Sequence, residues 1–254
     1  MVGRLGCVTV RCLRALSTEA AKPLYGTVTS HSGYIFLRAT EPPSEFPVKI
    51  STAIQRELQL RTMKWGTIVN FAWTGEPPNL PEGKTSATAF SSLGGRLEIP
   101  EISLENINEV TAKLSAHIRH GPIAPGTQEE AHLYICTHGA RDCRCGEQGS
   151  QVARALREEV ERRGLSHRMK VREVGHVGGH KYAANLLVYP HGEWLGQLRL
   201  GDVPHVIDTV LAHPIRPFTG QDSPILPTHW RGRMGLGKDE QISLFENYLS
   251  QHSA

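Results

Sequence analysis

The amino-acid sequence predicts an α/β (α+β) protein, and two observations carry this prediction. Strand-like and helix-like segments alternate along the 254 residues, a pattern typical of sheets covered by helices. Two strand-like segments near residue 190 are separated by a tight turn at His191-Gly192, which predicts an antiparallel hairpin at one edge of the sheet. The expected core is therefore a mixed sheet with helices packed on it.

Residues 23–120 are expected to form a smaller N-terminal α/β domain. Residues 33–37 read as a short apolar strand, and residues 67–73 are β-branched and aromatic, as in a buried strand. Between them we expect a helix over about residues 51–64, with Ser51 as its N-terminal cap.

The rest of this first half is predicted to be less regular. Residues 75–101 are rich in Pro, Gly and Ser and are expected to form a long excursion or lid. A helix is predicted over about residues 103–117, where apolar residues recur at helical spacing. Gly and Pro at residues 121–126 then predict a linker.

Residues 127–215 show a more regular order of elements. The expected strands are residues 132–136, 169–174, 185–189 and 194–200, and the expected helices are residues 147–163 and a final helix opened by Asp202 and Pro204. The resulting order, strand–helix–strand–loop–strand–strand–helix, is that of a thioredoxin-like domain, which we predict for this half. Residues 216–254 are expected to be a tail anchored by Trp230, followed by a helix.

Residues 1–22 carry the formal charge of the whole chain. They hold four basic residues and one acid, a net +3, which equals the +3 of the full sequence. A basic, nearly acid-free segment interleaved with apolar residues is typical of a mitochondrial transit peptide, and a disordered tail is the alternative. Because the remainder is neutral, we expect no nucleic-acid partner. We also expect no membrane span, since no run of about eighteen apolar residues occurs.

The cysteines are clustered. Cys7 and Cys12 would be lost on processing, which leaves Cys136, Cys143 and Cys145. Three cysteines within ten positions are not the disulfide framework of a large domain, so they indicate metal or thiol chemistry.

Two loops supply candidate metal ligands. Cys136 ends a predicted strand and Cys145 precedes a predicted helix, while His176 and His180 lie on the glycine-rich loop GHVGGHK. Two thiolates and two imidazoles form a metal site by ligand count. Zinc accepts such a set, and so does a two-iron cluster, because histidine replaces cysteine on one iron in Rieske centres. The spacing alone leaves both open.

The segments CTHGARDCRCG and GHVGGHKYAANLLVYPHGEWLG resemble the paired motifs of the sucrase/ferredoxin-like family of thioredoxin-like ferredoxins. The C-terminal HWRGRMGLGKDEQ resembles its mitochondrial branch. The resemblance implies a [2Fe-2S] cluster held by Cys136, Cys145, His176 and His180, with Cys143 outside the ligand set.

The implied function is single-electron transfer or redox sensing in thiol redox homeostasis, with an unidentified redox partner protein in the mitochondrial matrix or intermembrane space. An electron carrier is expected rather than a catalyst. Neutral imidazoles in place of thiolates are expected to raise the reduction potential and to make it fall as pH rises, and Arg141, Arg144 and Lys181 are expected to favour the reduced state. A zinc-stabilised interaction module and a Cys143/Cys145 thiol oxidoreductase are the alternatives.

Several other polar residues have simpler interpretations. His132, His138 and His191 are expected to be polar surface or turn residues. Asp142 is expected to cap its loop.

Overall fold

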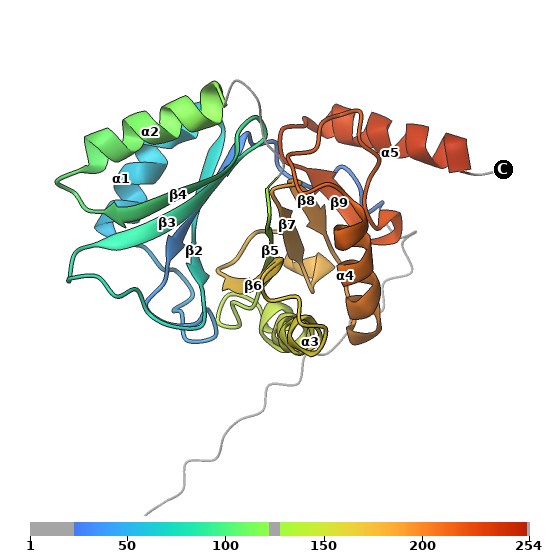
Figure 1. The fold of residues 1–254 in the computed structure, drawn as a ribbon, viewed down its shortest axis with the longest axis horizontal. Coiled ribbons are helices and arrows are strands. Elements are labelled where there is room, and N and C mark those ends of the chain that lie inside the picture. The colour runs from blue at the N-terminus through green and yellow to red at the C-terminus, as the bar shows by residue number, and fades with distance from the viewer. Residues whose placement is uncertain (1–22, 122–127, 253–254) are drawn as a thin grey trace, which may run out of the picture.

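The computed structural model describes residues 23–121 and 128–252, whose nine strands form one mixed sheet (Figure 1). The transit-peptide prediction for residues 1–22 and most of the predicted linker at residues 121–126 lie outside the described residues. The strands are β1 Gly33–Arg38, β2 Thr67–Trp73, β3 Thr85–Ser91, β4 Gly95–Ile102, β5 Ala131–Cys136, β6 Met169–Val174, β7 Leu186–Tyr189, β8 Glu193–Leu195 and β9 Trp230–Arg233. The helices are α1 Ala53–Thr62, α2 Ile107–Arg119, α3 Ser150–Arg162, α4 Val203–Ala212 and α5 Lys238–His252. The predicted mixed α/β class is confirmed.

The two halves of the sheet share one topology. The sheet order is β4-β3-β1-β2-β6-β5-β7-β8-β9. In the first half β1 pairs in parallel with β2 and antiparallel with β3, and β3 pairs antiparallel with β4. In the second half β5 pairs in the same way with β6 and β7, and β7 pairs with β8. The element order predicted for the second half therefore also describes the first.

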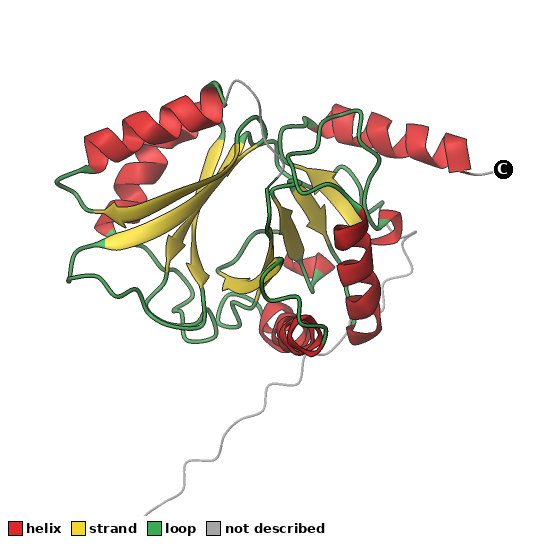
Figure 2. Cartoon of the chain, viewed as in Figure 1, coloured by secondary structure: helices red, strands yellow, loops and turns green. Residues whose placement is uncertain are grey.

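A short antiparallel ladder joins the halves, since Ala72 and Trp73 of β2 pair with Val174 and Glu173 of β6. Each half-sheet carries helices on one side, and the two remaining faces lie toward each other (Figure 2). Aromatic side chains fill this inner layer: Phe36 stacks on Tyr134 with ring centroids 3.7 Å apart. The inner layer therefore holds both halves together by burial of large apolar side chains.

The predicted excursion at residues 75–101 is wrong over most of its length. Strands β3 and β4 occupy residues 85–102 and form a hairpin. The sequence TSATAFS alternates small polar residues with Ala and Phe, and Ala89 and Phe90 are fully buried. The composition of β3 does not indicate a strand, because its side chains are mostly small. Its stability comes from packing between β1 and β4 rather than from β-propensity.

Element boundaries also differ from the predictions. Thr52 rather than Ser51 caps α1, because its hydroxyl accepts a hydrogen bond from the Gln55 amide. Helix α2 begins at Ile107, which leaves Leu104 about half exposed. Strand β8 ends at Leu195, five residues before the predicted end.

The C-terminal tail adds a strand rather than only an anchor. Trp230 is fully buried as predicted, and it opens β9, which pairs with β8. Arg233 of β9 forms an ion pair with Glu193 of β8, and both side chains are inaccessible to solvent. The Trp230 indole also donates a hydrogen bond to Glu193.

Burial of Glu193 is expected to make stability depend on pH. Burial raises the pKa of this carboxyl from 4.5 to about 7, and the Arg233 guanidinium opposes that rise only in part. Between these values the unfolded chain releases the proton while the folded chain retains it, so the free energy of unfolding falls as pH rises. Urea unfolding of wild type and Glu193→Gln at several pH values checks this. The stability difference between them should change across this window, and a constant difference would contradict it.

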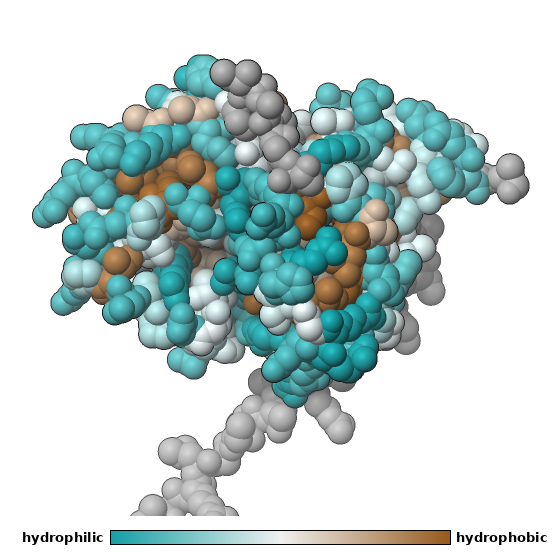
Figure 3. All heavy atoms as spheres, in the orientation of Figure 1, coloured by the Kyte–Doolittle hydropathy of each residue, from teal (hydrophilic) through white to brown (hydrophobic). Residues whose placement is uncertain are grey.

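None of the helices in the described residues is long and apolar enough to cross a membrane. The face seen in Figure 3 is mostly hydrophilic, with small apolar areas beside α2 and α4.

Candidate metal centre

The two candidate cysteines lie where β5 turns into α3. Cys136 is the last residue of β5, and Cys145 begins a single wide helical turn, Cys145–Gly149, that leads into α3. Both side chains are fully buried. Asp142 caps the intervening loop as predicted, because its carboxylate accepts a hydrogen bond from the Arg144 amide.

Close approach of this turn to β5 requires a glycine. A Cβ at Gly149 would lie 2.0 Å from the carbonyl oxygen of Cys136, so no other residue fits without moving the backbone of the cysteine. The contact therefore links the position of α3 to that of the Cys136 side chain.

Substituting Gly149 by alanine is expected to destabilise the fold by about 1–3 kcal/mol through overpacking. The matched control is Gly201→Ala, because a Cβ at Gly201 meets nothing within 4 Å, and its effect should stay within about 0.5 kcal/mol. Urea unfolding measures both free energies. Equal effects of the two substitutions would contradict the proposed role of the contact.

Three of the four predicted ligands converge. Ligand atoms of Cys136, Cys145 and His176 all lie within 4.8 Å of one another. His180 lies beside this group, with its ring centroid 5.7 Å from that of His176. Its Nδ1 is 3.7 Å from a carboxylate oxygen of Asp142, and its side chain is about half exposed.

The surroundings of Cys136 favour a thiolate. The Cys145 thiol, the His176 side chain and the backbone amides of His138 and Val177 donate toward its sulfur, and they hold the pKa of Cys136 well below its usual value although burial opposes this. The pKa of Cys145 is raised, first because its proton is shared with Cys136 and then because of burial. The Cys136 thiolate is thus already stabilised in the protein. The proton on Cys145 is the one that a bound cation would displace.

The buried polar atoms also fit a metal group. His176 Nδ1 is buried and has no hydrogen-bond partner within the part of the chain that the structure describes. A buried imidazole nitrogen without a partner is costly, and its lone pair suits a metal. Two thiols and an imidazole with one unpartnered nitrogen therefore form a donor set for iron or zinc.

His138 is a supporting residue that the sequence interpretation missed. The predicted surface or turn position is wrong for His132 and His138, which are buried in β5 and directly after it, whereas His191 lies in the turn between β7 and β8 as predicted, although it is buried. Nε2 of His138 donates to the Pro47 carbonyl at 2.9 Å, and Nδ1 accepts from the His176 amide at 3.3 Å. His138 therefore fixes the ligand loop to the first half of the chain.

Asn70 of β2 supports the same loop. Its amide group donates to the carbonyl oxygens of Gly175 and His176, both at 3.3 Å, and to the Tyr34 hydroxyl at 3.0 Å. No local sequence motif predicts the supporting role of Asn70 or His138, because each forms hydrogen bonds to residues about 40 or more positions away.

Arg231 of β9 is the buried cation near the cysteines. It donates to Asn185 Oδ1 at 2.8 Å and packs against Gly179, where a Cβ would clash with its guanidinium. Burial lowers the pKa of Arg231 to about 10, and the nearby Cys136 and Cys145 oppose that lowering. Arg144, by contrast, has its charge matched by Asp142, which accepts two hydrogen bonds of 2.9 Å from the guanidinium.

Comparison with known proteins gives matches over most of the chain. The model of the sucrase/ferredoxin-like family matches residues 24–232. Altered inheritance of mitochondria protein 32 of Meyerozyma guilliermondii is 38% identical over 82 residues, 31% of this chain and 29% of that protein. Actin patches distal protein 1 of Saccharomyces cerevisiae is 29% identical over 141 residues, 51% of this chain and 40% of that protein. The chain spans less than half the length of these curated relatives.

Among solved structures, the chain is similar to the thioredoxin-like [2Fe-2S] ferredoxin from Aquifex aeolicus, with 20% identity and a TM-score of 0.31 over 35% of this chain and 93% of that one. The family match covers well over half of the chain and includes both ligand loops. The chain therefore belongs to the sucrase/ferredoxin-like family.

Proposed function

We propose that this chain binds a [2Fe-2S] cluster through Cys136, Cys145, His176 and His180 and passes single electrons. The observation that carries the proposal is the convergence of ligand atoms of Cys136, Cys145 and His176, which all lie within 4.8 Å of one another. Membership in a family described as ferredoxin-like favours iron–sulfur over zinc.

The geometry of the glycine-rich loop supports His180 as the fourth ligand. Gly178 and Gly179 have positive φ values of +85° and +67°, which only glycine adopts readily. They turn the chain so that the rings of His176 and His180 lie on one side, 31° from parallel. Asp142 lies close enough to His180 to hold its ring near that of His176 before metal enters.

A bound cluster would supply a one-electron redox couple. The protein would supply four donor atoms, hydrogen bonds to sulfur and a buried positive charge. The backbone amides of His138 and Val177 aim at the Cys136 sulfur, and hydrogen bonds to sulfur raise the reduction potential. The site therefore favours acceptance of an electron more than an all-cysteine site does.

Metal and sulfide analysis of anaerobically purified protein tests the proposal. We expect about two iron atoms and two sulfides per chain and a brown sample with absorption between about 400 and 600 nm. A colourless protein with about one zinc per chain would replace the proposal with the zinc-stabilised module. Metal-free protein with thiol-exchange activity would support the Cys143/Cys145 oxidoreductase.

Substituting Arg231 by methionine is expected to lower the reduction potential of the cluster by tens of millivolts, because a buried positive charge stabilises the reduced state. Arg144→Gln is the matched control, and a smaller shift is expected because the Arg144 side chain is 40% exposed, so solvent screens its charge. Potentiometric titration measures both shifts. A larger shift for Arg144→Gln than for Arg231→Met would contradict this account.

We also propose a mitochondrial location, with residues 1–22 acting as the transit peptide. The names of several relatives link them to mitochondria. Fractionation of cells that produce the tagged full chain tests this, with the chain lacking residues 1–22 as control. Retention of the truncated chain in mitochondria would assign targeting to another segment.

A further inference from the structure

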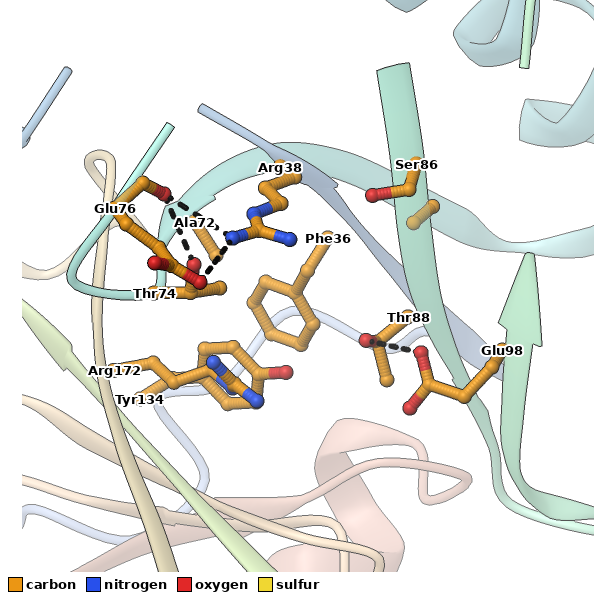
Figure 4. Close-up of a pocket in the computed structure, with 11 residues that line it drawn as sticks. Phe36, Arg38, Ala72, Thr74, Glu76, Ser86, Thr88, Glu98, Tyr134 and Arg172 are labelled. Carbon is orange, nitrogen blue, oxygen red and sulfur yellow. Dashed lines mark hydrogen bonds and ion pairs between the residues drawn. The ribbon is translucent and has the colours of Figure 1, made fainter. Parts of the chain in front are cut away.

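A cavity of about 250 Å³ lies between the two halves of the sheet, away from the candidate metal centre (Figure 4). Its residues come from both halves: Phe36 and Arg38 of β1 and Thr88 of β3 face Tyr134 of β5 and Arg172 of β6. It shares no residue with the four proposed cluster ligands.

Arg172 is the cavity residue that determines which chemical class of ligand would bind. Its Nε is buried and has no hydrogen-bond partner among residues 23–121 and 128–252. The side chain forms no ion pair with a carboxylate of the described residues either. A half-buried guanidinium without a counter-charge is costly, because buried charges are normally paired.

The other charges of the cavity are already matched. Arg38 pairs with Glu76 at 3.1 Å, while Glu98 accepts a hydrogen bond from Thr88 at 2.8 Å and lies 3.7 Å from Arg96. Figure 4 shows the pairs Arg38–Glu76 and Thr88–Glu98 on opposite sides of the cavity. The unmatched charge of the cavity is therefore that of Arg172, and it is positive.

The remaining lining is apolar and aromatic at its centre. The ring of Phe36 lies between the two arginines in Figure 4 and stacks on Tyr134, with an interplanar angle of 4°. Tyr134 and Arg172 are paired residues of β5 and β6, so the ring and the guanidinium are held by the sheet itself. The site is thus preformed rather than made by mobile loops.

We infer that this cavity binds a small organic anion, whose carboxylate or phosphate group pairs with Arg172 and whose apolar part packs on Phe36. Arg172 lines the cavity, and the terminal N–H groups of its guanidinium offer the two-point contact that carboxylates and phosphates accept. The volume sets the ligand size at that of a small metabolite.

The site is linked to the metal centre through the sheet. Arg38, Ala72, Val174 and Cys136 are successive partners across β1, β2, β6 and β5. Three strand spacings separate the first from the last, about 14 Å. The inference does not depend on the cluster, because none of the cavity residues is a proposed ligand.

Calorimetric titration of the purified full chain with phenyl phosphate, benzoate and inorganic phosphate tests this inference, with benzyl alcohol as the neutral analogue. At low salt we expect saturable binding of an aryl anion at or below about 10 mM, and binding of benzyl alcohol at least about 10-fold weaker. Comparison of phenyl phosphate with benzoate decides between phosphate and carboxylate ligands.

Arg172→Gln should weaken binding of the aryl anion about 10-fold or more. Arg172→Lys keeps the positive charge but loses the planar pair of N–H donors, so its affinity for the aryl anion should lie between those of Arg172→Gln and wild type. Arg154→Gln is the matched control, because Arg154 is exposed on α3 and should leave affinity unchanged. Absence of saturable binding, or equal affinities in Arg172→Gln and Arg154→Gln, would overturn the inference. Visible absorption of each sample reports the cluster separately, so failure of one proposal is distinguishable from failure of the other.

Discussion

Replacing Cys136 by serine is expected to abolish cluster binding and leave a colourless protein. Cys136 is fully buried, and the hydrogen bonds that it receives hold its pKa well below the usual value. A serine hydroxyl does not ionise under these conditions and is a poor ligand for iron, which prefers thiolate sulfur in such clusters. We expect iron content to fall at least about 10-fold, because one of two sulfur ligands is lost.

Cys143→Ser is the matched control, since it changes a cysteine of the same motif that lies outside the convergent group. It is expected to retain iron and colour. Loss of colour in Cys143→Ser with retention in Cys136→Ser would reassign the ligand set, and retention in both would show that Cys136 is not a required ligand. Iron, sulfide and visible absorption are measured on samples prepared side by side.

Replacing Arg233 by methionine is expected to reduce the free energy of unfolding by about 3–5 kcal/mol, the usual cost of breaking a buried ion pair. Arg233 has no exposed side-chain area, and it also donates to the carbonyl oxygens of Asp222 and Ser223, at 2.7 and 3.1 Å. Its loss removes the counter-charge of Glu193, which keeps only the Trp230 indole as a donor, and leaves these carbonyl groups without the Arg233 donor. Urea unfolding above pH 7, where Glu193 is ionised in the folded chain, measures the change.

The comparison variant is Arg216→Met, because Arg216 also pairs with an acid, Asp222, but more than a third of its side chain is exposed. Partly exposed pairs contribute less than about 1 kcal/mol. A loss of under about 1 kcal/mol in Arg233→Met would show that the buried pair does not stabilise the joint of β8 and β9.

Local patterns predicted the second half of the fold well. Strand β6 has the predicted limits, residues 169–174, and β5 ends at Cys136 as predicted. These strands are short, apolar or alternating, and bounded by glycine or polar turns, so local sequence carries their signal. The first half was predicted less completely, because β3 consists mostly of small residues that gain stability from the strands on both sides.

Long-range features of the site were not visible in the sequence. His138, Asn70 and Arg231 support the ligand loops from elements far away in the chain, and no spacing rule connects them. The shared topology of the two halves was also hidden, since it rests on strand pairing rather than on sequence repetition. The cysteines and histidines were identifiable because their residue types are rare and chemically specific.

The central claim is that two sulfurs and two imidazole nitrogens surround one two-iron cluster. Pulsed paramagnetic resonance of the anaerobically purified and reduced protein, with ¹⁵N-labelled histidine, tests this most directly. We expect coupling to two histidine nitrogens, with the coupling of one nitrogen lost in His176→Cys and that of the other lost in His180→Cys. A cluster signal without nitrogen coupling, or a preparation that contains no iron, would contradict it.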